Sequence, residues 1–251
     1  MLPEPLAAGG RALAARIDPR VRLVAALAYS SATAVWQKPA SIAAALVFAL
    51  ALAVFFRLSA GSVLRRLFAV NGFIALLWIF LPFSLPGEAL LRLGPLAASR
   101  EGVLLAFAIT LKSNALVLAL LALVAPLSLP TAGHALHRLG APGKLVQLLL
   151  LTWRYLALLE QEFRRLRRAA ALRGFRPRTD LHTYRTFAWL LGMLLVRAVD
   201  RAERVRRAMV CRGFQGVFFS LHEFHLGRGS LAFAAAVAAA VAASAALEFA
   251  R

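Results

Sequence analysis

The stretch that decides the fold is LAFAAAVAAAVAASAAL, at positions 231–247. Its 17 residues carry no charge, and every one except Ser244 is Ala, Val, Leu or Phe. A helix of about 17 to 25 mostly apolar residues is long enough to cross the hydrocarbon core of a bilayer. The stretch therefore predicts a transmembrane helix.

Four earlier stretches satisfy the same length criterion. Asp18 followed by Pro19 is a good helix start, since a carboxylate can cap the first turn and proline fits the first helical position. The next proline, Pro39, allows that helix to run as far as Lys38. The four stretches are 19–38, 40–56, 67–85, which contains Asn71, and 102–129. Together with 231–247 they predict about five transmembrane helices and an all-α integral membrane protein.

Composition supports a membrane protein with a strongly basic region. The chain is 61% hydrophobic, yet it carries a formal net charge of +19. Soluble globular domains rarely combine these two properties. A nucleic-acid-binding protein could match the charge, but it would not need long uncharged apolar runs, so we exclude nucleic acid as a partner. The single cysteine, Cys211, excludes an intramolecular disulfide.

The distribution of positive charge predicts the orientation. The apolar stretches 145–159 and 186–199 are short for spans, and if both crossed, the Arg-rich segments around them would lie on opposite sides of the membrane. With five spans and an inside N-terminus, 25 Lys and Arg residues lie inside and four outside, with Lys112 within a span. We therefore predict a membrane region over 1–127, a cytoplasmic insert over 128–228 and a last span over 229–251.

Two long helices are predicted in the insert. Pro142-Gly143 can start a helix that runs to Arg173, and Thr179-Asp180 can cap another that runs to Arg212. Each would be about 45 Å long at 1.5 Å per residue. Both have an apolar N-terminal half and an Arg-rich C-terminal half.

The ends of these helices repeat one motif. RLRRAAALRGF occupies 165–175 and RVRRAMVCRGF occupies 204–214, with seven of eleven positions identical. Helix capping accounts for one Arg-Gly-Phe: glycine takes a left-handed conformation, phenylalanine packs back on the last turn, and arginine favours the negative end of the helix dipole. Capping requires neither the upstream Arg-Arg-Ala nor a second copy. Two similar basic ends fit a partner with two similar sites, such as a two-fold symmetric dimer.

On these residues the chain resembles the transmembrane (T) component of energy-coupling factor (ECF) transporters, in the cobalt/nickel-type CbiQ family. In that family two cytoplasmic coupling helices each end in an Ala-Arg-Gly-like motif that docks on a pair of ABC-type ATPase subunits. The resemblance is specific over 137–175 and 194–216, which include Thr152-Trp153-Arg154-Tyr155, and otherwise rests on topology. The matching residues are Leu172, Arg173 and Gly174, and Cys211, Arg212 and Gly213, with Leu172 and Cys211 in place of Ala.

The resemblance implies a non-catalytic coupling subunit in the cytoplasmic (inner) membrane. Its partners would be an ABC-type ATPase dimer, which binds ATP and Mg, and a membrane subunit (S) that captures cobalt or nickel. The sequence itself contains no phosphate-binding Gly-x-x-x-x-Gly-Lys-Ser/Thr loop, because Gly143-Lys144 lacks the upstream glycine and is followed by Leu145. We therefore expect no cofactor and no catalytic residue in this chain. A T component of a vitamin-type ECF transporter is the alternative within the same class.

Other interpretations remain open for a few polar residues. Lys112 and Asn114 could belong to a polar pathway, or Lys112 could simply be satisfied between packed helices. Histidines at His134 and His137, and the group His222, Glu223 and His225, could share a metal, but they lie outside the predicted spans, and we predict no metal site. A membrane scaffold that binds anionic lipid is a rival explanation of the arginines. It would use Arg164, Arg165, Arg167, Arg168, Arg204, Arg206 and Arg207.

Overall fold

The computed structural model describes residues 17–84, 89–93, 96–216 and 227–249. The chain divides into two compact units. The first combines Met1–Ala135 with Glu223–Arg251, and the second is Leu136–His222. The apolar stretches at both ends of the sequence therefore fold together, and the Arg-rich middle forms a unit of its own.

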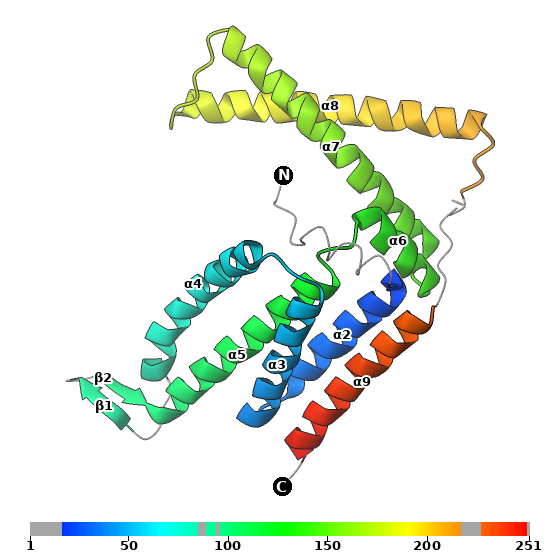
Figure 1. Cartoon of the computed structure of the whole chain (residues 1–251). Coiled ribbons are helices and arrows are strands. Elements are labelled where there is room, and N and C mark those ends of the chain that lie inside the picture. Colours follow the sequence, from blue (N-terminus) through cyan, green and yellow to red (C-terminus); the bar gives the residue numbers. More distant parts are fainter. Residues whose placement is uncertain (1–16, 85–88, 94–95, 217–226, 250–251) are drawn as a thin grey trace. The chain divides into compact units, whose positions relative to one another are not determined.

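Among the described residues, five helices lie entirely within the first unit (Figure 1). The central one, α5, packs against α2, α3 and α4, and α9 packs against α2 and α3. This arrangement confirms the predicted all-α fold. The helices are α2 (Pro19–Val35), α3 (Pro39–Phe55), α4 (Ala60–Ser84), α5 (Arg100–Leu123) and α9 (Arg228–Phe249). A shorter helix, α6 (Leu129–Arg138), begins in this unit and ends in the second.

Three of these helices, α4, α5 and α9, are long and apolar enough to cross a membrane. The apolar helix α3 has 17 residues, at the lower limit for a span. Helix α2 also has 17 residues but includes Arg20 and Arg22 in its first turn. The chain is thus a multi-pass membrane protein, while the full number of five spans stays a prediction.

Several helix ends differ from the sequence prediction. Helix α2 ends at Val35 and not at Lys38, because Pro39 disfavours helical geometry at Lys38, which is extended at φ −69° and ψ 136°. The predicted span 102–129 ends at Leu123, and α6 follows as a separate helix. Helix α4 begins at Ala60 and so includes Arg65 and Arg66, which the prediction placed before the span.

A short antiparallel hairpin lies between α4 and α5. Its strands are β1 (Ala89–Leu93) and β2 (Leu96–Ser99), with Arg92 opposite Ala97. These strands were not predicted from the sequence. Ser99, at the end of β2, also caps α5, because its Oγ accepts a hydrogen bond from the Gly102 N–H at 3.1 Å.

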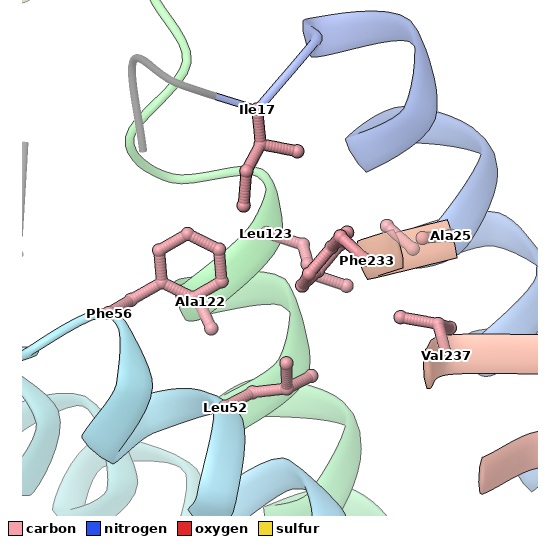
Figure 2. Close-up of a cluster of buried hydrophobic side chains, with 9 residues drawn as sticks. Ile17, Ala25, Leu52, Phe56, Ala122, Leu123, Phe233 and Val237 are labelled. Atoms are coloured by element: carbon pink, nitrogen blue, oxygen red, sulfur yellow. The ribbon is translucent and has the colours of Figure 1, made fainter. Parts of the chain in front are cut away.

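The first unit has a hydrophobic core where α2, α3, α5 and α9 meet. Phe56 and Leu123 are fully buried there, and the rings of Phe56 and Phe233 meet edge to face with centroids 5.9 Å apart (Figure 2). A second cluster surrounds Tyr29 and Ile42. The Tyr29 hydroxyl donates a 2.7 Å hydrogen bond to the Ala45 carbonyl and so joins α2 to α3.

Charged side chains form hydrogen bonds with backbone groups at the ends of neighbouring helices. Lys112 Nζ donates a 3.1 Å hydrogen bond to the carbonyl of Ala34, in the last turn of α2, where carbonyls have no partner within the helix. This contact favours the explanation of Lys112 as a charge satisfied between packed helices. The Glu248 carboxylate of α9 accepts the N–H groups of Gln37 and Lys38, each at 3.0 Å. Nothing in the structure explains Asn114, whose buried side-chain oxygen has no partner among the described residues.

Gly102 is expected to be essential for the packing of α5 on the end of α4. A Cβ at this position would lie 2.7 Å from both the Leu81 carbonyl oxygen and the Pro82 Cα, which are backbone atoms that cannot rotate away. We expect Gly102→Ala to lower the free energy of unfolding by about 1–3 kcal/mol, the usual cost of overpacking. Thermal unfolding of the purified protein in detergent measures this loss. Gly72→Ala, where a Cβ meets no atom within 4 Å, is the matched control and should not lower the melting temperature.

Candidate functional site

The second unit is built mainly from two long helices. Helix α7 (Gly143–Leu172) has 30 residues, and α8 (Leu181–Cys211) has 31. Both starts lie where the sequence predicted them. Asp180 caps α8 by accepting the Thr183 N–H at 2.8 Å, and hydrogen bonds from the hydroxyl and then the N–H of Thr183 lower the pKa of Asp180.

The two helices cross near their middles (Figure 1). Glu162 of α7 forms an ion pair with Arg197 of α8, and the Glu162 side chain is only 13% exposed. Arg165 lies 3.8 Å from the same carboxylate. Because the crossing lies in the middle, the C-terminal ends of α7 and α8 lie apart on opposite sides of it.

Both helices end in the same hydrogen-bonded turn. Gly174 has a φ of 84°, its N–H bonds to the Ala171 carbonyl, and the Phe175 N–H bonds to the Ala170 carbonyl. At the other end Gly213 has a φ of 78°, with bonds from Gly213 to Val210 and from Phe214 to Met209. These are the two bonds of the Schellman motif. The predicted capping role of both glycines is thus confirmed.

Helix α6 ends in the same way without an arginine. Gly140 has a φ of 98°, its N–H bonds to the His137 carbonyl, and the Ala141 N–H bonds to the Leu136 carbonyl. The residue before Gly140 is Leu139, where the longer helices have Arg173 or Arg212. An arginine at this position is therefore not needed to form the cap.

All six predicted site residues are exposed. Leu172 is 90% exposed, and Cys211 is also at the surface. Neither Arg173 nor Arg212 forms an ion pair with a described residue, whereas Arg164 pairs with Glu160 and Arg207 with Glu203. The structure groups these residues as two separate sites: Leu172, Arg173 and Gly174 at the C-terminal end of α7, and Cys211, Arg212 and Gly213 at the C-terminal end of α8.

The two phenylalanines after the caps behave differently. Phe175, which follows α7, contacts α8. Its ring contacts Phe187 of α8 edge to face, with centroids 5.8 Å apart, because the chain turns back at once into α8. Phe214 lines a groove between the C-terminal half of α8 and the N-terminal half of α7. The groove has a volume of about 420 Å³, and Tyr155, Leu158 and Val205 are among its walls.

This groove and the ion pair at the crossing were not predicted from the sequence. A signal for the ion pair was present, since Glu162 and Arg197 lie close to the middle of their helices. The groove has no comparable signal, because it depends on the angle between the helices. As for metals, His222, Glu223 and His225 lie outside the described residues, and the described ranges contain no group of three or more metal-binding side chains.

Comparison with known proteins identifies the family. The family model described as CbiQ, cobalt transport protein, matches residues 10–224. A curated relative, the cobalt transport protein CbiQ of Salmonella typhimurium, is 32% identical over 154 residues, which cover 59% of this chain and 68% of the relative. The residues matched by the family model include both long helices and both Arg-Gly ends. The chain therefore belongs to the CbiQ family of cobalt transport proteins.

Proposed function

We propose that the chain is the T component of an ECF-type importer, which links ATP hydrolysis by a separate ABC-type ATPase dimer to a membrane subunit that captures the ion. One observation carries this proposal: two helices of almost equal length each present an exposed arginine immediately before a left-handed glycine. The cap of α6 forms without an arginine, so the repeated arginines call for another explanation.

Arg173 and Arg212 are the proposed anchors in the two ATPase subunits. An arginine can pair with a partner carboxylate through two parallel hydrogen bonds, which lysine cannot reproduce. Gly174 and Gly213 let the chain turn away directly after each anchor, so that the ATPase can approach the helix end. Leu172 and Cys211 lie beside the anchors and would form the apolar part of each contact.

The proposed mechanism is mechanical. Closure of the ATPase dimer on ATP moves the anchored ends of α7 and α8 relative to each other. The ion pair between Glu162 and Arg197 keeps the helices joined at their crossing, so movement of the ends also moves their apolar N-terminal halves. ATP and Mg bind to the partner, and this chain performs no chemistry of its own.

The proposed orientation places the second unit in the cytoplasm. It rests on the charge distribution, with 17 basic and five acidic residues in 136–216, and on the general excess of Lys and Arg in cytoplasmic segments of membrane proteins. The protein would lie in the inner membrane of the cell, and its N-terminus would be on the cytoplasmic side. Cobalt is the favoured ion because the proteins of the CbiQ family are described as cobalt transport proteins. Nickel is the next candidate.

Purification of the tagged chain from gently solubilised native membranes tests this function. We expect a P-loop ATPase and a second membrane protein to co-purify, and we expect deletion of the gene to abolish uptake of radioactive cobalt. A chain that co-purifies with no ATPase, under conditions that keep other membrane complexes intact, would favour the rival lipid-binding scaffold. Uptake of nickel but not cobalt by the wild-type strain would change the ion and leave the coupling role intact.

A further inference from the structure

A group of arginines on α7 lies away from α8. At about 100° per residue, Arg164, Arg167 and Arg168 lie roughly 120° to 160° around the helix from Glu162, which pairs with α8. All three arginines are exposed. Arg164, Arg167 and Arg168 therefore form a separate face of α7, the basic face.

The basic face has uncompensated charge and a place for an anion. Arg164 pairs with Glu160, but Arg167 and Arg168 form no ion pair with a described residue. An open hollow of about 450 Å³ lies along this stretch, lined by Gln161, Arg165 and the three arginines of the basic face. Guanidinium groups arranged around an open space are suited to phosphate, which accepts hydrogen bonds from several of them at once.

The same helix exposes large apolar side chains N-terminal to the basic face. Leu149 is 37% exposed, Trp153 48% and Leu156 55%, and Trp153 lies on nearly the same side of α7 as Arg164. In α8, exposed apolar side chains also lie N-terminal to the arginines: Trp189 is 75% exposed and Met193 49% exposed, and both precede Arg204. Exposed tryptophan and leucine next to arginine are typical of helices that lie at a membrane surface.

We infer that the basic face binds the headgroups of anionic phospholipids. A free phosphate or nucleotide would be held by the arginines alone and would leave the adjoining apolar side chains exposed to water. A lipid surface accounts for both features, because phosphates contact the arginines while Trp153 and its neighbours enter the interfacial region. The chain is itself a membrane protein, so such a surface is always close.

Lipid binding here is compatible with the proposed docking but does not depend on it. Arg173 lies roughly 140° to 180° around α7 from Arg164 and Arg168. One side of the helix can therefore contact lipid while its end contacts another protein. The two roles can be separated by changing different arginines.

Photo-crosslinking in nanodiscs tests the inference on the full-length chain. The protein is placed in phosphatidylcholine nanodiscs that contain phosphatidylglycerol with a photoreactive headgroup, and the crosslinked peptides are identified by mass spectrometry. We expect crosslinks to residues 160–172, reduced at least about ten-fold in R164Q/R167Q/R168Q, since each arginine near an anionic surface contributes measurably to binding. A high salt concentration should reduce them as well.

The control variant R176Q/R178Q/R185Q removes the same charge from exposed positions in the same unit and should retain the crosslinks. Absence of crosslinks on α7 in the wild-type protein overturns the inference, as does an equal loss in both variants, which would indicate only a general charge effect. Co-purification of the ATPase is measured in parallel. If R164Q/R167Q/R168Q loses the ATPase but keeps the lipid crosslinks, the basic face binds a protein and the inference is wrong.

Discussion

Reversal of both anchor charges, R173E together with R212E, is expected to abolish cobalt uptake and to release the ATPase, while the chain remains in the membrane at its normal level. Loss of an arginine from a buried charge pair costs about 2–5 kcal/mol, much of it because the partner carboxylate is left without a counterion. Even the lower value corresponds to about a thirty-fold loss of affinity at each site. Reversed charges add repulsion, so the double variant should retain no measurable coupling.

Three companion variants make this result specific. R176E/R185E reverses two exposed charges in the same unit and should keep both the ATPase and uptake. R173K/R212K keeps the positive charge but cannot form two parallel hydrogen bonds to a carboxylate. It should therefore bind the ATPase better than R173E/R212E but less well than the wild-type chain. L139R adds an arginine before the left-handed glycine of α6 and should change neither property. If R173E/R212E keeps the ATPase and transports normally, the two arginines are only parts of helix ends, and the anchor proposal fails.

The sequence was sufficient for those parts of the fold that depend on local chemistry. Long apolar runs predicted the helices of the first unit, and Asp18 and Asp180 marked the starts of α2 and α8, because capping requires only neighbouring residues. The glycines of the repeated motif were correctly placed at helix ends for the same reason. Whether Arg173 and Arg212 dock on an ATPase depends on a partner and stays a prediction.

Features that depend on distant parts of the chain were not predictable. Lys112 reaches a carbonyl 78 residues away, and only the packing of α5 on α2 shows that this charge completes a helix end. Phe175 packs on α8 because the loop after α7 is short and turns back, which a helix-capping rule does not include. The groove beside Phe214 likewise arises from the crossing of two helices, and neither helix determines that crossing alone.

Arg22 is expected to have the largest effect on the stability of the first unit. Its side chain is almost completely buried, with a residue exposure of 2%, and it lies over the ring of Phe56 with its guanidinium carbon 5.4 Å from the ring centroid. Its Nη2 donates a 3.3 Å hydrogen bond to the Ala122 carbonyl, in the last turn of α5. Arg22→Ala removes this hydrogen bond and the cation–π contact, and it leaves a cavity where α2, α3 and α5 meet.

The expected cost of Arg22→Ala is about 3–5 kcal/mol, which corresponds to a fall of roughly 10 °C in the melting temperature of the detergent-purified protein. Arg22→Met keeps most of the volume but cannot donate to Ala122, so it should be less destabilising and measure the packing separately. Arg65→Ala removes an exposed arginine of α4 and should cost less than about 1 kcal/mol. A melting temperature for Arg22→Ala equal to that of Arg65→Ala would mean that Arg22 does not hold α5 in place, since a buried group with these contacts cannot be removed without loss of stability.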